Sequence, residues 1–382
     1  MMIQANRLNK VSEYYFSSKL QEVRNLEAQG KPIINLGIGS PDLPPPPEVI
    51  AGLNHALLNP VAHQYQPYKG TVDFRKAIAL FYQNHYGVIL DPAKEILPLM
   101  GSKEGITHIS MAFLNEGDGV LIPNPGYPTY EAVTNMIGAT PVFYDLDEEG
   151  GWLPDLQKLE SQDLSRVKLM WVNYPHMPTG AVATKEVFRN LVAFGKRNDI
   201  LVVNDNPYSF ILNDEPKSIL KTEGAIDGVL ELNSLSKSFN MSGWRIGMVC
   251  GSEHNLNIIL KVKSNMDSGM FFPLQAGAVE ALALSGSWFA AQNELYKARK
   301  IKILELASIL GCEPSKGQTG MFVWTRVPAG NTSAQFVDHL LHEHNIFAAP
   351  GFIFGSQGEG YVRFSLCATE EDIDRAINRF QS

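Results

Sequence analysis

The sequence predicts an α/β fold with a large domain built on a mainly parallel sheet and a smaller α+β domain. Short apolar runs alternate with amphipathic stretches between residues 118 and 251, which is typical of strands buried on both faces and joined by helices. The pattern changes near residue 276, and 382 residues are enough for two domains. A run of prolines, Pro44 to Pro47, separates the first segment from the rest.

The expected strands of the large sheet are six short apolar segments, each bounded by turn residues. They cover residues 118–123, 140–144, 167–173, 200–205, 228–233 and 246–251. A helix is expected over 184–198, because Thr184 can cap its start and apolar residues recur along one face. The proline run is expected to form a stiff, extended connector, because proline does not fit a helix interior.

The smaller domain is expected to begin with a long helical region after residue 276. Strands over 320–327, 346–351 and 361–366 follow, and then a terminal helix. We assign residues 48–275 to the large domain, and residues 1–47 with 276–382 to the small domain.

Composition argues against several classes of partner. The net charge of −8 leaves no basic field for nucleic acid or anionic lipid. No apolar run reaches the 18 residues of a membrane span, and the start lacks the apolar core of a secretory signal. Three cysteines lie far apart without metal or disulfide spacing. We therefore expect a cytoplasmic protein without nucleic-acid or membrane partners.

Several polar side chains follow the ends of the expected strands, where ligands bind in open α/β sheets. Asp205 closes "ILVVND", Tyr208 comes three residues later, and Lys237 follows "GVLELN". Other candidates at this rim suit an anion or a flat ring, namely Gly101 and Ser102 at a helix start, Ser234, Ser236, Arg245 and Tyr127. Each alone has a structural interpretation, such as a cap, a surface lysine or a packing tyrosine. Their convergence on one rim indicates a site.

A series of motifs then occurs in an order typical of one family. They are "NLGIGSPDL", "YQPYKGTVDFR", "GSKEGI", "NPGYPTY", "PTGAV", "NDNPYSF", "SLSKSFNMSGWRIG" and "YVRFSL". The chain resembles, nearly end to end, the class I/II aminotransferases of the fold-type I pyridoxal 5′-phosphate enzymes. The resemblance implies transfer of an amino group between an L-amino acid and a 2-oxo acid by a ping-pong mechanism.

The resemblance also implies a role for each cofactor-binding candidate. Lys237 would be the Schiff-base lysine and proton shuttle, and Asp205 would keep the ring nitrogen of pyridoxal phosphate protonated. Tyr208 would donate to the phenolic oxygen of the ring, and Tyr127 would stack on its face. The phosphate would be held by Arg245 and its neighbours in these motifs, namely Ser102, Lys103, Ser234 and Ser236.

Three further residues acquire roles through the same resemblance. Arg363 of "YVRFSL" would grip the substrate α-carboxylate, and the backbone around Gly39 would cover the substrate. Tyr65 of "YQPYKG" matches a tyrosine that reaches the phosphate of the neighbouring subunit, which implies a homodimer. The alternative for Tyr65 is a turn tyrosine beside Pro67 and Gly70.

One position departs from the family pattern. The family carries Asn-Pro-Thr-Gly where this chain has "MPTG", so Met177 replaces an asparagine that contacts the ring oxygen and the substrate carboxylate. A thioether cannot donate a hydrogen bond. We expect looser carboxylate anchoring and an altered pKa of the cofactor linkage, unless Asn173 or His176 substitutes.

Two other motifs are discounted. The histidines of "HLLHEH" (339–344) do not fit a common metal-ligand spacing, so no metal is expected. The sequence "GIGS" (37–40) lacks the third glycine of a dinucleotide fingerprint.

Alternative functions remain open at this stage. The same cofactor could serve a C–S β-lyase or a related elimination or cyclase reaction, and a cofactor-binding regulator without turnover is a third possibility. "GSKEGI" and "NMDSGMFFPLQ" resemble the branch of LL-diaminopimelate and neutral amino acid aminotransferases. The preferred donor stays undetermined, although no second arginine for a dicarboxylate is evident.

Overall fold

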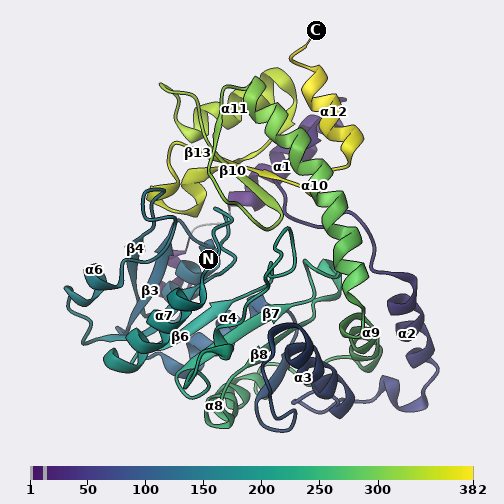
Figure 1. Ribbon diagram of the computed structural model, residues 1–382, viewed down its shortest axis with the longest axis vertical. Coiled ribbons are helices and arrows are strands. Elements are labelled where there is room, and N and C mark those ends of the chain that lie inside the picture. Colours follow the sequence, from purple (N-terminus) through teal and green to yellow (C-terminus); the bar gives the residue numbers. More distant parts are fainter. Residues whose placement is uncertain (1–2, 12–14, 382) are drawn as a thin grey trace.

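A seven-stranded sheet forms the larger part of the molecule (Figure 1). The computed structural model describes residues 3–11 and 15–381. The strand order is β2-β8-β7-β6-β5-β3-β4, and all neighbours are parallel except β8, which is antiparallel to β2 and β7. The strands are β2 (Ile96–Leu99), β3 (Gly119–Asn124), β4 (Thr140–Asp145), β5 (Val167–Val172), β6 (Leu201–Asp205), β7 (Val229–Ser234) and β8 (Gly247–Cys250). The predicted α/β class is confirmed.

Helices cover both faces of this sheet. Alternate side chains of one strand enter different cores: Leu169 and Trp171 of β5 pack toward α4, α5 and α8, whereas Met170 and Val172 join the core on the side of α3 and α7. The helices are α1 (Tyr15–Ala28), α2 (Pro47–Leu57), α3 (Val72–Tyr86), α4 (Ser102–Phe113), α5 (Pro128–Met136), α6 (Leu156–Glu160), α7 (Lys185–Asn198), α8 (Glu253–Lys263), α9 (Phe272–Leu282), α10 (Gly286–Ile309), α11 (Ser333–His344) and α12 (Glu370–Asn378). Double coverage explains why the strands are apolar without alternation. Within the part of the chain that is described, no helix is both long and apolar enough to cross a membrane.

Helix α7 forms where its sequence pattern predicts a helix. The Thr184 side chain accepts a hydrogen bond from the Val187 amide at 3.2 Å and so caps the first turn. Phe188 and Leu191 are buried on the inner face, and the helix ends at Asp199 in the left-handed conformation.

Two smaller sheets lie together at the top of Figure 1. One is antiparallel, in the order β12 (Ala349–Pro350), β13 (Tyr361–Ser365), β10 (Phe322–Arg326) and β9 (Glu313–Pro314). The other pairs β1 (Ile34–Asn35) with β11 (Ile346–Phe347) in parallel, so the N-terminal segment joins the C-terminal part of the chain. Helix α10 extends from α9, which lies beside the large sheet, up to the smaller sheets.

Some boundaries differ from the sequence predictions. Pro47 is the first residue of α2 and not part of an extended connector, because a proline at the first helical position loses no hydrogen bond. The strand expected over 346–351 is split between two sheets, and residue 351 already begins a 3₁₀ turn. The division into domains at residues 48 and 275 stays a prediction; residues 1–2, 12–14 and 382 of the predicted small domain lie outside the described residues.

Candidate active site

A cavity of about 580 Å³ opens beyond the carboxyl ends of β2, β3, β6 and β7, below the smaller sheets. Eleven of the twelve site residues singled out from the sequence line it. These residues are Gly39, Ser102, Lys103, Tyr127, Asp205, Tyr208, Ser234, Ser236, Lys237, Arg245 and Arg363. Tyr65 does not line the cavity; its side chain is 91% exposed on the surface of the subunit.

Asp205 lies at the deep end of the cavity, at the last residue of β6. Its Oδ2 accepts a hydrogen bond from the Tyr130 hydroxyl at 2.9 Å. Its Oδ1 is buried and has no hydrogen-bond partner among residues 3–11 and 15–381. Burial raises the pKa of Asp205 to about 7, although Tyr130 and Lys237 oppose the shift. A cationic N–H group in the cavity would satisfy Oδ1 and restore the charge of this carboxylate.

Tyr130 is a functional neighbour that the sequence predictions missed. It belongs to the quoted motif "NPGYPTY", one helical turn after Tyr127, and it stacks on Trp171 with 4.9 Å between the ring centroids. Tyr127 is the residue before α5 and Tyr130 lies three residues later, a spacing that would have placed both tyrosines on the cavity side. The hydrogen bond from the Tyr130 hydroxyl fixes the position of the Asp205 carboxylate.

Lys237 follows β7 and points to the loop that contains Gly39. Its Nζ donates to the Gly39 carbonyl at 2.5 Å, and burial lowers the pKa of Lys237 to about 8. An amine with this pKa can take up and release a proton near neutral pH. The ring of Phe322 packs against Gly39 so closely that any Cβ there would collide with it, so the approach of this loop requires glycine.

One end of the cavity is suited to a phosphate group. Ser102 begins α4, whose first amides and dipole favour an anion. The preceding Gly101 has φ +90°, and a Cβ at this position would collide with the Arg245 guanidinium. Ser234 Oγ donates to Ser236 Oγ at 2.8 Å, so the Ser236 hydroxyl can direct its own hydrogen elsewhere. Lys103 and Arg245 both line the cavity, and burial and the nearby Arg245 lower the pKa of Lys103.

Two tyrosines flank the space between Asp205 and the phosphate end. Tyr127 precedes the first residue of α5, and Tyr208 follows β6 and contacts the Phe322 ring edge-on at 5.8 Å. Burial raises the pKa of Tyr208, which keeps its hydroxyl protonated and able to donate. The residues present therefore fit a flat heterocycle with a phosphate arm: Tyr127 could cover its face, Tyr208 could donate to a ring oxygen, and Asp205 could pair with a cationic ring nitrogen.

Arg363 of β13 lines the cavity from the side of the smaller sheets. Its Nη2 donates to the Gly37 carbonyl at 2.8 Å, and its Nη1 lies 3.2 Å from the Met177 sulfur. The guanidinium carbon is 3.9 Å from the centroid of the Phe322 ring. The arginine is thus held rigidly while its planar fork suits a carboxylate.

The two residues suggested as substitutes for the family asparagine, Asn173 and His176, are engaged with neighbouring groups of the protein. His176 does not line the cavity, and its Nδ1 is 2.8 Å from the Thr179 hydroxyl. Asn173 lines the cavity, but its Oδ1 accepts from the Met177 amide at 2.8 Å and its Nδ2 donates to the Asp205 carbonyl at 2.5 Å.

Buried His176 is expected to make the fold sensitive to acid. Burial lowers its pKa from 6.5 to about 3, so below pH 6.5 the unfolded chain binds a proton that the folded chain refuses. Stability should fall by about 1.4 kcal/mol per pH unit from this residue alone, between pH 6.5 and 3. Denaturant unfolding between pH 7 and 4.5 should show a shallower loss for His176→Asn than for the wild type. His55→Asn, a change at an exposed helix end, should keep the wild-type slope, and equal slopes for all three proteins would contradict the expectation.

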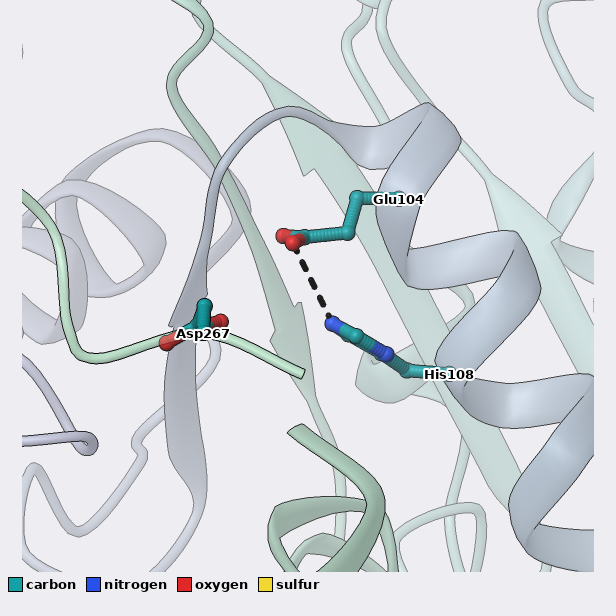
Figure 2. Close-up of side chains that lie close together, drawn as sticks. All are labelled: Glu104, His108 and Asp267. Carbon is teal, nitrogen blue, oxygen red and sulfur yellow. Dashed lines mark ion pairs between the residues drawn. The ribbon is translucent and has the colours of Figure 1, made fainter. Parts of the chain in front are cut away.

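A second titratable cluster lies outside the cavity, between α4 and the segment after α8 (Figure 2). His108 Nε2 is 3.3 Å from Glu104 Oε1, and Asp267 lies beside them. The Lys263 ammonium is 2.8 Å from both oxygens of Asp267. Although burial opposes it, hydrogen bonds from His108 and the Met100 amide lower the pKa of Glu104. Protein groups already pair with both carboxylates, Lys263 with Asp267 and His108 with Glu104, so we assign the cluster a structural role in fixing α4.

Comparison with known proteins places the chain among aminotransferases. The family "Aminotransferase class I and II" matches residues 31–380. An LL-diaminopimelate aminotransferase of Halothermothrix orenii is 37% identical, with 100% of this chain and 98% of that protein covered. Apo-BacF from Bacillus subtilis superposes with a TM-score of 0.96 at 36% identity, covering 100% and 98% of the two chains. A mutant of Thermus thermophilus aspartate aminotransferase superposes with a TM-score of 0.92 at 26% identity, covering 100% and 99%.

Proposed function

Because the chain belongs to the class I and II aminotransferases and is a transaminase, we propose that its cavity holds pyridoxal 5′-phosphate and that Lys237 carries out the proton transfers. The observation that best supports this is the buried, unsatisfied Oδ1 of Asp205 opposite the lowered-pKa amine of Lys237. The named relatives catalyse transamination, so the family does not favour the C–S β-lyase alternative.

When bound, the cofactor would supply an electron-withdrawing ring that stabilises negative charge at the substrate Cα. Asp205 would hold the ring nitrogen, Tyr208 would donate to the ring oxygen, and Tyr127 would cover one face. Arg363 would orient the substrate α-carboxylate as a bidentate pair. Lys237 Nζ would take the proton from the substrate Cα and carry it while the amino group is transferred. The Gly39 loop would exclude water.

The visible absorbance of the purified protein tests this proposal. With single amino acids and no oxo acid, the yellow band of the bound cofactor should bleach to the amino form and stay bleached. A band that returns while pyruvate and ammonia accumulate would indicate a lyase. A band that responds to no donor would indicate a regulator without turnover. No band after addition of cofactor would refute the proposal.

We further propose that two copies of the chain form a homodimer in which Tyr65 reaches the phosphate site of its partner. Apolar side chains are exposed around Tyr65: Val61 is 49%, Met266 59% and Phe271 43% exposed. The Phe271 ring lies 6.2 Å from His63, so these segments share one surface. An exposed apolar patch of this kind is typical of an interface.

Mixed dimers can test this arrangement. If Tyr65 acts across the interface, dimers that combine a Tyr65→Ala subunit with a Lys237→Ala subunit contain one intact site, although each parent dimer is inactive or impaired. Activity should therefore reappear on co-expression of the two variants. If the co-expressed protein is no more active than the parents, Tyr65 does not act in the partner site.

A cytoplasmic location is also proposed. All three cysteines, Cys250, Cys312 and Cys367, are buried and unbonded, as expected in a reducing compartment.

A further inference from the structure

We infer that this transaminase prefers amino donors with a large apolar side chain, an inference that rests on the proposed function above. The rings of Phe16, Phe322 and Phe354 lie next to the Arg363 guanidinium. Leu20, Ile38 and Met177 line the same cavity, and Ser17 is the one hydroxyl that α1 adds, so the lining near the carboxylate-binding arginine is mainly apolar. Such a wall stabilises a donor in proportion to the apolar area it buries.

Among the described residues, the charged side chains that line the cavity lie where we propose that the cofactor and the substrate α-carboxylate bind. Lys237 serves the proton transfer, Arg245 and Lys103 lie at the phosphate end, and Arg363 faces the α-carboxylate. Among the described lining residues Asp205 is the only acid, and it lies at the deep end. A distal carboxylate or ammonium on the substrate would therefore enter the apolar part without an opposite charge, which is unfavourable. Aspartate, glutamate and LL-diaminopimelate should be poor donors.

Met177 strengthens the preference. Its sulfur lies 3.2 Å from Arg363 Nη1, in the place where an amide could have donated to the substrate carboxylate. The Arg363 guanidinium also lies over the Phe322 ring at 3.9 Å and the Phe354 ring at 4.7 Å. With one donor fewer for the carboxylate, more of the binding must come from the side chain of the donor. Small donors such as alanine should therefore suffer most.

The donor panel that tests the inference comprises phenylalanine, methionine, alanine, aspartate, glutamate and LL-diaminopimelate, each measured with the holoenzyme in single-turnover absorbance. We expect kcat/KM for phenylalanine or methionine to exceed that for alanine by about 100-fold, and to exceed those of the charged donors as well. A charged donor or alanine in first place would overturn the inference and leave the transaminase proposal intact. Bleaching by no donor at all would instead refute the proposed function.

Variants locate the cause of the preference. Met177→Asn should lower KM for alanine by about tenfold and change KM for phenylalanine less, because the restored amide matters most where the side chain contributes least. Leu20→Arg should move the preference toward aspartate and glutamate, whereas Ile89→Arg, at an 84% exposed position, should not. If Leu20→Arg does not fold, Leu20→Ala should still lower the phenylalanine-to-alanine ratio of kcat/KM by about tenfold. Unchanged ratios in Met177→Asn and Leu20→Ala would contradict the inference.

Discussion

Lys237→Ala is expected to lower turnover by about 10⁴-fold, because it removes the amine that we propose to move the proton at the substrate Cα. Lys237 is buried, its pKa is lowered to about 8, and its Nζ already contacts the Gly39 carbonyl over the substrate space. No solvent lysine can supply the same geometry. Steady-state turnover with the best amino donor measures the effect.

Lys185→Ala is a matched control, since Lys185 is exposed at the start of α7 and should leave turnover unchanged. Borohydride reduction of the wild-type holoenzyme followed by peptide mass analysis should place the cofactor on residue 237. Turnover of Lys237→Ala within tenfold of the wild type, or a label on another lysine, would mean that a different group performs this chemistry.

Asp205→Asn should have the second largest effect and reduce kcat by about 10³-fold, corresponding to about 4 kcal/mol. The amide keeps the size of the side chain and can still accept from Tyr130, but it cannot stabilise a cation opposite it. Tyr130→Phe leaves the carboxylate in place and removes one hydrogen bond, so its effect should be nearer tenfold. Asp199→Asn at the exposed end of α7 provides the matched control and should have wild-type kcat.

The free energy of unfolding, measured on the protein without cofactor, shows whether Asp205 serves catalysis or mainly supports the fold. The pKa of Asp205 is raised to about 7 in the folded chain, so the wild type loses stability as pH rises from about 4 to 7. Asp205→Asn removes this cost and should be more stable than the wild type at pH 8, while being far less active. A variant that is both inactive and less stable at pH 8 would indicate that Asp205 mainly supports the fold.

Local sequence patterns were sufficient to predict those strands and helices whose burial follows directly from the sequence. The six strands predicted for the large sheet and α7 appear within a residue or two of their expected bounds, because apolar runs and the Thr184 cap act over only a few residues. Asp205 and Lys237 could be placed at one rim for the same reason, since the carboxyl ends of parallel strands lie at a common edge.

Contacts between distant segments could not be predicted in this way. Met177 and Arg363 are 186 residues apart, and nothing in "MPTG" or "YVRFSL" indicates that a sulfur lies against the guanidinium. The pairing of β1 with β11 was likewise invisible, because each strand has only two residues and no strong period. Pro47 was misassigned because a proline run permits both an extended segment and a helix start.

The order of apolar segments determined the α/β class from the sequence by itself, and the ordered motifs predicted the kind of reaction through their resemblance to the class I/II aminotransferases. The tertiary structure alone decided which side chains touch: Tyr130 under Asp205, Phe322 against Gly39, and Met177 against Arg363. Strand and helix formation depend on neighbours in the sequence. The contact of Tyr130 with Asp205 depends instead on how α5 packs against the large sheet, and that of Met177 with Arg363 on how the smaller sheets pack over it. That packing sums many weak apolar contacts between residues far apart in the chain, and it shapes the apolar space in which a substrate side chain would be recognised.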